Sequence, residues 1–435
     1  MALGGGTFTS QNKVLPGAYI NFVSLAAASA TLSDRGVAAM GLEIGWGPTG
    51  DVFEITNEDF INNSFTFLGY AYDADALKPL RDIFKNATKV YAYRLNGGGA
   101  KASNTFATAK YAGTRGNDIT IVIAVNVDDN DKWDVSTYVD TTEVDKQVVA
   151  SAADLVSNDW VDFDTTATLA ATSGTALTGG TNSTVDSTAH QTFLSKLESY
   201  TFNALGYVGT TDTIKSLYVA YTKRLRDEVG KKFVTAIYSK AADYEGVVNV
   251  KNAVTDAGAD TSSLVYWVVG LLAGMAVNAS ATNNVYTGEY TPNTSYTQAQ
   301  LEAAINAGEF TLHNVDDTVR VLTDINSLTT TTDEKGDVFK SNQTVRVCDQ
   351  IAMDIAALFN TKYLGNIPND ASGRASLWLD IVKHHEDLES IRAIEDFDED
   401  DVVVEQGNTK QSVVVTDAIT VVNSMEKLYM TVTVQ

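Results

Sequence analysis

The residue pattern with the clearest chemical meaning is Gly45-Trp46-Gly47-Pro48-Thr49-Gly50, which matches the dinucleotide fingerprint G-x-G-x-x-G and follows an apolar stretch. In that fingerprint the pyrophosphate lies on the N-terminus of a helix that comes directly after the glycines. Here residues 51–56 have the pattern of an extended segment, and Pro48 stiffens the turn. We therefore interpret the motif as a glycine turn. An enzyme of the doubly wound α/β type stays an alternative, which tight nucleotide binding at these residues would support.

Three acidic residues, Asp396, Asp398 and Asp400, have the D-x-D-x-D spacing that opens an EF-hand loop. That loop needs glycine at its sixth position and glutamate at its twelfth, because the chain must turn sharply and the last ligand is bidentate. Asp401 and Gly407 occupy those two positions here. The sequence therefore predicts a solvated acidic turn and no calcium site.

The chain has four histidines, His190, His313, His384 and His385, and one cysteine, Cys348. Their spacing gives no H-E-x-x-H motif and no zinc pairing. We expect one of the two adjacent histidines to be packed and the other exposed. Cys348 lies in an apolar helical pattern, which predicts a buried, unreactive thiol.

Nucleophile and phosphate motifs are also missing from the sequence. It contains neither the G-x-S-x-G elbow of serine hydrolases nor a G-x-x-x-x-G-K-[ST] loop. The turn at residues 113–117, Gly-Thr-Arg-Gly-Asn, has a single base, so we interpret it as a structural turn. The sequence predicts a protein that is not an enzyme and binds no cofactor or metal.

Composition points to a folded, acidic protein. The 435 residues are 44% hydrophobic, and 55 acidic residues against 31 basic ones give a net charge of −24. A nucleic-acid partner is not expected, because phosphate contacts need a basic face. High acidity favours solubility and makes self-association depend on salt.

No membrane segment is expected either. The N-terminus has no basic stretch followed by an apolar run, so it does not resemble a signal peptide. The longest apolar stretch, Leu264 to Val277, is 14 residues long, whereas a membrane span needs about 20. We interpret it as a buried helix and expect a soluble protein made in the cytoplasm, without direct membrane insertion.

Both ends of the chain have strand periodicity and no partner nearby in sequence. At the N-terminus the alternating residues are Ala18, Tyr19, Ile20, Asn21, Phe22 and Val23. At the C-terminus Leu428, Met430, Val432 and Val434 share one face of a predicted strand, and Tyr429, Thr431, Thr433 and Gln435 share the other. An exposed terminal strand aggregates unless another chain or domain pairs with it. We therefore expect the two ends to be arms, residues 1–25 and 423–435, that supply intersubunit strands.

Between the arms, the pattern predicts three domains. Residues 26–98 and 196–330 read as one discontinuous α/β domain, in which residues 205–208, 214–229 and 233–238 form a βαβ unit with a parallel strand pair. Residues 99–195 are rich in short β-type runs and predict an inserted β-rich sandwich domain.

Residues 331–422 predict a C-terminal α+β domain. It has two helices, the second capped by Asp370 or Ser372, and then a hairpin that turns near Gly407-Asn408. The strands of this hairpin are predicted from two runs of valine, Val402, Val403 and Val404 in the first, and Val413, Val414 and Val415 in the second.

Three segments in this order resemble the contractile tail sheath proteins of Gram-positive prophages and phage-tail-like bacteriocins (tailocins). They are "YAGTRGND" at residues 111–118, the helical stretch "QIAMDIAALFNTKYLGNIPNDASGR" and the C-terminal block "IRAIEDFDEDDVVVEQGNTKQSVVVTDAITVVNSMEKLYMTVTV". The likeness spans nearly the whole chain. It implies a multidomain fold of α/β and α+β type, with a subtilisin-like but non-catalytic central domain.

The resemblance also implies a function. Such a protein would polymerise as hexameric rings stacked into a helical sheath around an inner tail tube, linked by exchanged β-strand arms. It would contract by rigid-body rearrangement from a metastable extended state and drive the tube through a target envelope. Baseplate and tail terminator proteins would be its other partners, and it would pass from the bacterial host cytoplasm into a virion or phage-tail-like particle. Another self-assembling structural protein, a tail tube or surface-layer subunit, is the alternative.

Overall fold

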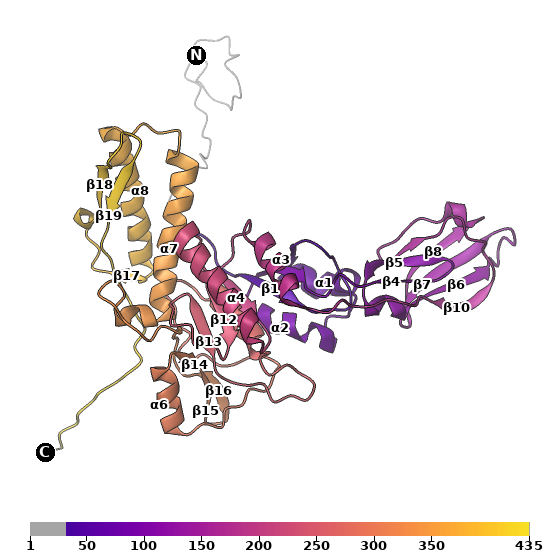
Figure 1. Cartoon of the computed structure of the whole chain (residues 1–435), viewed down its shortest axis with the longest axis horizontal. Helices are drawn as coiled ribbons and strands as arrows, with labels where there is room; N and C mark the ends of the chain where they lie inside the picture. Colours follow the sequence, from indigo (N-terminus) through magenta and orange to yellow (C-terminus); the bar gives the residue numbers. More distant parts are fainter. Residues whose placement is uncertain (1–31, 435) are drawn as a thin grey trace, which may run out of the picture. The chain divides into compact units, whose positions relative to one another are not determined.

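The computed structural model describes residues 32–434 of the chain. These residues form two compact units (Figure 1). The large unit contains residues 34–352 and 421–434, and the small unit contains residues 32–33 and 353–420. The predicted N-terminal strand, Ala18 to Val23, lies outside the described residues.

The large unit is built on a seven-stranded sheet of order β14-β13-β12-β11-β1-β3-β2. Its strands are β1 (Val37–Leu42), β2 (Phe53–Thr56), β3 (Lys89–Arg94), β11 (Ala204–Tyr207), β12 (Val234–Tyr238), β13 (Val247–Val250) and β14 (Glu309–Phe310). All neighbours pair in parallel except β2, which is antiparallel to β3. The sheet thus joins strands from both sides of the β-rich segment, and the predicted parallel pair β11–β12 is confirmed.

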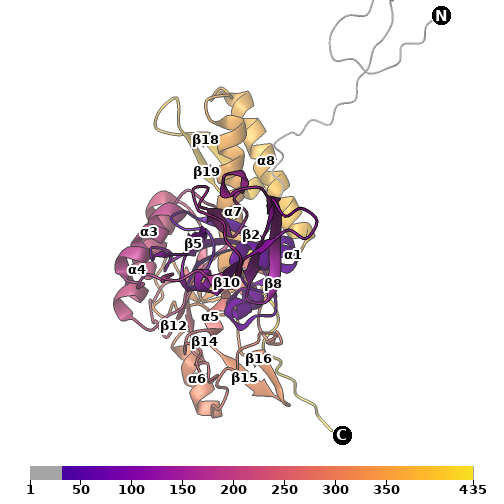
Figure 2. The same ribbon diagram turned by 90° about the vertical axis from the view of Figure 1, so that its right-hand side faces the viewer.

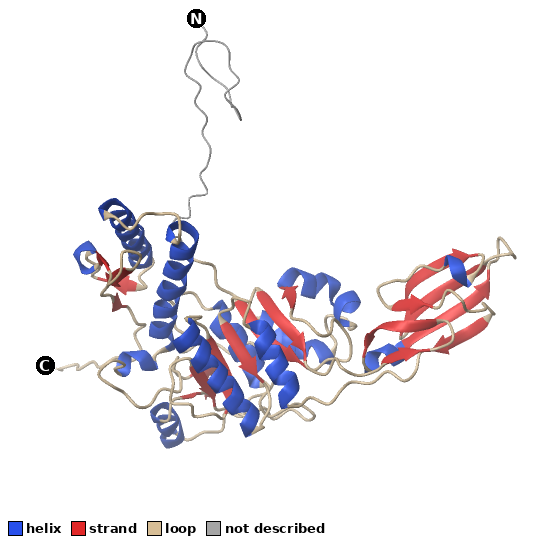
Figure 3. Cartoon of the chain, turned by 45° about the horizontal axis from the view of Figure 1, so that its top comes forward, coloured by secondary structure: helices blue, strands red, loops and turns tan. Residues whose placement is uncertain are grey.

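Helices cover both faces of this sheet (Figures 2 and 3). Strand residues alternate between two apolar cores: Ala38 and Met40 pack in one, and Ala39 packs in the other. The first core is covered by α1 (Asn57–Leu68), α2 (Lys78–Phe84) and α5 (Leu264–Gly274), and the second by α3 (Ser187–Leu197) and α4 (Asp212–Lys223). A π-helical stretch, Arg224–Val229, extends α4, and α6 (Gln298–Asn306) packs near β14.

Helix α5 confirms the prediction of a buried helix at the longest apolar stretch. Two glycines let it approach α2 closely. A Cβ at Gly270 would lie 2.2 Å from the carbonyl oxygen of Ile83, and one at Gly274 would lie 1.9 Å from that of Asn86. Because these contacts involve backbone atoms, no side-chain rearrangement could make room for a larger residue.

The β-rich segment is a sandwich of two antiparallel sheets around one core. The four-stranded sheet has the order β10-β6-β7-β8 and the three-stranded sheet the order β4-β5-β9. The strands are β4 (Lys101–Ser103), β5 (Ala107–Ala112), β6 (Ile119–Val125), β7 (Trp133–Val139), β8 (Thr142–Val149), β9 (Val161–Phe163) and β10 (Thr172–Ala176). The predicted β-sandwich is confirmed, and Trp46, from the turn that follows β1, completes its core.

The small unit contains a helical pair and a hairpin. Its elements are α7 (Asn342–Leu358), whose first part belongs to the large unit, a π-helical turn at Phe359–Tyr363, α8 (Ala371–Ser390), β17 (Ile394–Glu395), β18 (Val403–Gln406) and β19 (Val413–Thr416). Asp370 caps α8 by accepting a hydrogen bond from the backbone N–H of Gly373 at 2.8 Å. Of the two predicted caps, Asp370 is therefore the one used.

The remaining elements are short. The large unit has a hairpin of β15 (Leu312–Val315) and β16 (Thr318–Val321), and β20 is Thr420–Val421. Short 3-10 turns span Asp75–Leu77, Thr114–Asp118, Ala152–Asp154, Asp337–Lys340 and Glu399–Asp401.

Candidate assembly interface

Two glycine turns, residues 45–50 and 113–117, lie at the junction of the sheet and the sandwich. After residues 45–50 the chain forms β2, and α1 begins only at Asn57, so the turn is not followed directly by a helix N-terminus. The backbone N–H of Arg115 donates to the carbonyl oxygen of Gly45. A Cβ at Gly113, whose φ is +139°, would lie 2.1 Å from that same oxygen. Both motifs therefore join two layers of the fold, as expected for structural turns.

Two buried arginines complete this junction. Arg94 donates from Nε to the carbonyl oxygen of Ile44 at 2.8 Å and from Nη1 to that of Ala112 at 2.6 Å. Arg115 is paired with Asp118 and Asp140 at 2.9 and 2.6 Å. The single base of the 113–117 turn is thus held by two carboxylates, which makes it a poor phosphate ligand.

A crevice of about 390 Å³ opens at the carboxyl ends of β1 and β11, where ligands commonly bind in open α/β sheets. His190 lines it, with Nδ1 3.0 Å from the hydroxyl of Tyr218. Burial lowers the pKa of His190 to about 4, so its ring is neutral at pH 7. Loss of solvent, and then the charge of Asp260, raises the pKa of Glu43 on the same crevice.

Neither the thiol of Cys348 nor any set of possible metal ligands forms a reactive group among the described residues. Burial raises the pKa of the Cys348 thiol to about 11, which keeps it protonated at neutral pH, as the prediction of an unreactive thiol requires. Within residues 32–434, no three His, Cys, Asp or Glu side chains are grouped so as to hold a metal ion. None of the helices in the same range is both long and apolar enough for a bilayer span.

The C-terminal arm, residues 423–434, exposes large apolar side chains to solvent. It is extended and pairs with no strand in the described part of the chain. Its large apolar side chains are almost fully open to solvent: Leu428 is 85% exposed, Met430 73%, Val432 70% and Val434 90%. Since these residues recur at every second position, they would form one apolar face if the segment were a strand, and a folded chain would normally cover such a face.

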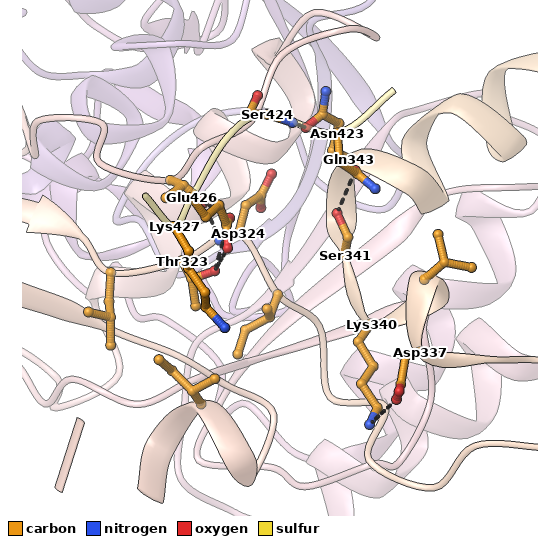
Figure 4. Close-up of a pocket in the computed structure, with 15 residues that line it drawn as sticks. Thr323, Asp324, Asp337, Lys340, Ser341, Gln343, Asn423, Ser424, Glu426 and Lys427 are labelled. Atoms are coloured by element: carbon orange, nitrogen blue, oxygen red, sulfur yellow. Dashed lines mark hydrogen bonds and ion pairs between the residues drawn. The ribbon is translucent and has the colours of Figure 1, made fainter. Parts of the chain in front are cut away.

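The base of this arm is fixed to the large unit (Figure 4). Gln343 at the start of α7 donates from Nε2 to the carbonyl oxygen of Val422 at 3.1 Å and accepts from the N–H of Ser424 at 3.0 Å. The carboxylate of Glu426 accepts from the hydroxyls of Thr282 at 2.6 Å and Thr323 at 3.1 Å. These contacts border a hollow of about 660 Å³, and beyond Lys427 the arm leaves the unit.

The predicted hairpin is present as β18 and β19. Val404 faces Val415 and Gln406 faces Val413 across the antiparallel pair, and the N–H of Gly407 closes the turn on the carbonyl oxygen of Ser412 at 2.8 Å. One detail of the prediction is wrong. Val402 lies before the strand and is only 3% exposed, because it packs in the core of the small unit.

Both outer edges of the hairpin lack a strand partner within residues 32–434. Val403, Val414 and Val415 are 44%, 52% and 40% exposed. An edge of this kind, rich in β-branched residues, is a template for pairing with another chain. Among residues 32–434, an extended segment and a hairpin thus both lack a strand partner.

The adjacent histidines differ from expectation. His384 and His385 on α8 are both fully buried, so the prediction that one is exposed is wrong. His384 Nε2 lies 3.0 Å from a carboxylate oxygen of Asp354, and His385 Nε2 lies 2.7 Å from one of Asp417. Two buried polar rings are tolerated here because each has its own acceptor.

Four family models match the chain in succession. They are the tail sheath protein Gp18 domain III N-terminal region (residues 35–95), the phage tail sheath protein beta-sandwich domain (96–182), the phage tail sheath protein central domain (183–327) and the phage tail sheath C-terminal domain (334–435). The chain is also 33% identical over 470 residues to the phage-like element PBSX protein XkdK of Bacillus subtilis, with 99% of this chain and 100% of that protein covered. The chain belongs to the phage tail sheath protein family. The resemblance drawn from the sequence is confirmed.

Solved structures agree with this assignment. The sheath protein matches the sheath tail protein from Desulfitobacterium hafniense with a TM-score of 0.84 and 37% identity, covering 95% of this chain and 99% of that one. It matches the sheath tail protein Lin1278 from Listeria innocua with a TM-score of 0.78 and 33% identity, covering 93% and 96%. The protein is therefore a structural subunit of a tail sheath, a component of a virion or a tail-like particle.

The residues that attach the start of the C-terminal arm to the large unit were not predicted from the sequence. Glu426 reads as an ordinary surface acid, and its partners Thr282 and Thr323 lie more than 100 residues away. A weak signal existed in α7, where Gln343, Arg346 and Asp354 are polar yet buried. Polar residues at helical spacing within an apolar pattern indicate specific partners.

Proposed function

We propose that this sheath subunit polymerises helically around an inner tail tube through exchanged β-strand arms. The observation that carries the proposal is the row of exposed apolar side chains at every second position of residues 428–434. The same chain has a β18–β19 hairpin whose two outer edges have no strand partner among residues 32–434. Strand addition would satisfy the backbone of both partners and set the register through alternating side chains. Such a contact is head-to-tail, so it repeats into rings or helices.

The reach of the arm suits this role. The 12 residues 423–434 span up to about 40 Å when extended, whereas a folded body of about 400 residues has a radius of gyration near 21 Å. The N-terminal arm, residues 1–25, is proposed to act in the same way through Ala18 to Val23. In this proposal the hairpins of neighbouring subunits receive both arms, and hexameric rings stack into the sheath.

Contraction is the second part of the proposal. A rigid-body change between two packings of the same subunits would shorten the sheath and drive the tube through a target envelope. The extended state would be kinetically trapped at assembly in the host cytoplasm, on a tube and baseplate and below a tail terminator. The helical sheath of the anti-feeding prophage, solved in a contracted state, shares the fold with a TM-score of 0.58 at 14% identity over 97% of this chain and 99% of that one.

The folded domains of the subunit are proposed to catalyse no reaction. We infer a non-enzymatic subunit with no cofactor and no nucleic-acid partner, in which the domains have the boundaries expected from sequence and the central sheet is related to subtilisin. The mostly parallel sheet with helices on both faces supports that relation. The raised thiol pKa and the neutral His190 support the absence of catalysis.

The experiment is electron microscopy of the purified full chain and three variants. A variant lacking residues 428–435 is expected to form no regular tubes. Lysine at Leu428, Met430 and Val432 should also prevent tubes, whereas lysine at Tyr429, Thr431 and Thr433 adds the same charge to the other face and should be tolerated better. Regular tubes from the truncated variant would overturn strand exchange. Equal behaviour of the two lysine variants would contradict a role for the apolar side chains of Leu428, Met430 and Val432.

A further inference from the structure

The strand order of the central sheet reverses at β1, and a crevice opens at that point. Strands β2 and β3 follow β1 on one side of it, and β11, β12 and β13 follow on the other. In open α/β sheets such a reversal leaves a gap outside the carboxyl ends of the two strands, where ligands bind. The crevice of about 390 Å³ lies there, lined by Gly41 and Glu43 at the end of β1 and by Gly206 and Tyr207 at the end of β11. This volume suits a small molecule.

The charge of the crevice is negative and uncompensated. Its lining contains two carboxylates, Glu43 and Asp260, and neither lysine nor arginine. Both side chains are exposed, and neither forms an ion pair with another residue in the described part of the chain. Partial loss of solvent, and then the charge of Asp260, raises the pKa of Glu43, so the two acids oppose each other's ionisation. A bound cation would relieve that repulsion.

Aromatic rings form much of the crevice wall. The rings in the lining are those of His190, Tyr207, Tyr218, Tyr266 and Tyr290. One of them already receives an ammonium group, because Nζ of Lys78 lies 4.4 Å from the ring centroid of Tyr290. The face of an aromatic ring attracts cations, since its quadrupole is negative there. Acids and aromatic faces together therefore favour an organic cation as the ligand.

The buried part of the lining offers a hydrogen-bond donor. His190 is only 4% exposed, and its Nε2 atom has no hydrogen-bond partner among residues 32–434, although it is not sealed off from solvent. The hydroxyl of Tyr218 is buried 3.0 Å from Nδ1 of His190. A buried hydroxyl donates where it can, so Nδ1 accepts, and the hydrogen of the neutral ring is on Nε2. This N–H is available to an oxygen atom of a ligand.

We propose that the crevice binds a small organic cation that carries both an ammonium group and a neutral oxygen acceptor, such as a short amino alcohol. Glu43 and Asp260 attract the ammonium group, the tyrosine rings surround it, and the Nε2–H of His190 donates to the oxygen. A ligand carboxylate is disfavoured, because the crevice already contains two. Strand exchange between subunits does not use this crevice, so the two proposals are independent.

The test is isothermal titration calorimetry of the unassembled full chain with three probes of similar size. The first, 4-amino-1-butanol, has both groups, pentylamine has a methyl group in place of the oxygen, and 1,4-butanediol has a hydroxyl in place of the ammonium. Pentylamine should bind roughly threefold to tenfold more weakly than the amino alcohol, because it leaves the Nε2–H without an acceptor. The diol should bind at least roughly tenfold more weakly, because it has no charge.

Two outcomes of the titration would overturn the proposal. One is no measurable binding of 4-amino-1-butanol, and the other is equally tight binding of the diol. Equal binding of pentylamine would remove the oxygen from the ligand and contradict the role of His190.

Variants locate the binding in the crevice. Glu43→Gln and Asp260→Asn each remove one charge, keep the size of an exposed side chain and should weaken the binding of 4-amino-1-butanol several-fold. Glu58→Gln is the matched control, because Glu58 is an exposed acid in the first turn of α1 and does not line the crevice. It should bind the probe as the native chain does. Equal weakening in the control would show that only the overall negative charge attracts the probe, and the site would be wrong.

A second measurement reads the donor directly. In a chain labelled with ¹⁵N-histidine, NMR of the ring nitrogens shows which nitrogen of His190 carries the hydrogen, and His190→Gln identifies the signals. The hydrogen is expected on Nε2, whose signal should shift more with 4-amino-1-butanol than with pentylamine. A hydrogen on Nδ1 would contradict the donor. These measurements use single chains and strand exchange is read on tubes, so either proposal can fail without the other.

Discussion

Strand β6 and the C-terminal arm share one sequence pattern and have opposite surroundings. In β6 the residues Ile119, Ile121 and Ile123 recur at every second position and are at most 1% exposed, between β7 and β10. In the arm, the apolar residues Leu428 and Val432 follow the same two-residue spacing and are 85% and 70% exposed. Alternation therefore fixes which side chains share a face, but it does not say which chain supplies the cover.

The test with the largest expected effect introduces one negative charge into β6 and one into the C-terminal arm. Ile121→Asp should destabilise the sandwich by more than about 4 kcal/mol, because an unpaired carboxylate would be buried. Val432→Asp should leave the melting temperature of the unassembled chain unchanged, since that side chain already meets water, and should prevent tube formation. Thermal unfolding and electron microscopy measure the two effects. A large loss of monomer stability for Val432→Asp would show that the arm is covered by its own chain.

A second test concerns charge inside the body and on its surface. Arg226 is bound by both oxygens of Asp349 at 2.6 and 2.8 Å and is almost completely buried. Asp349→Ala should lower the free energy of unfolding by about 3–5 kcal/mol, because it leaves a buried charge without its partner. Asp51→Ala breaks the exposed pair with Lys196 and should cost less than about 1 kcal/mol. Urea denaturation of both variants provides the comparison, and equal losses would contradict it.

A third test uses pH, which should act on the body and not on the arm. Because the pKa of His190 is lowered in the folded protein, protonation favours the unfolded chain, so stability falls as the pH drops below about 6.5. Between pH 7 and 5 this residue should account for about 2 kcal/mol of lost stability. His190→Gln should remove that part of the loss in denaturation experiments at the two pH values.

The control for the pH test is the variant lacking residues 428–435, which has all four histidines. It should lose stability between pH 7 and 5 to the same extent as the full chain. An unchanged pH dependence in His190→Gln would mean that folding does not lower the pKa of His190.

The smallest expected effect lies at the base of the arm. Glu426→Gln weakens the contacts to Thr282 and Thr323 and should change the free energy of unfolding by less than about 1 kcal/mol. Hydrogen exchange of residues 422–426 should nevertheless become several-fold faster, because that segment opens locally. Lys427→Gln is the matched control and should not alter exchange there. Equal exchange in both variants would remove Glu426 as the attachment point.

Local pattern was enough to predict much of the fold. The βαβ unit around α4, the sandwich and the hairpin turn at Gly407 follow from periodicity and turn residues that are adjacent in sequence. The interpretation of residues 45–50 as a glycine turn also followed from local order, because β2 comes between this turn and α1.

Long-range contacts were the part that sequence could not supply. Val402 is buried because helices α7 and α8 pack against it, which no feature of a three-valine run reveals. His385 is buried because Asp417, 32 residues later, provides an acceptor. The capture of Glu426 depends on threonines in other parts of the chain. Burial of a polar group is decided by its partner, and the partner is set by the tertiary fold.

Helix α7 holds the bases of both arms, and this has a mechanical consequence. Gln343 binds the start of the C-terminal arm and Asp354 binds Ser33, eleven residues further along the same helix. In a sheath linked by these arms, α7 would offer a path of about three turns between these two attachment points. In such a sheath α7 would connect the two arm attachments of each subunit. Its stiffness would then limit how much of a pull on one subunit is transmitted to the next.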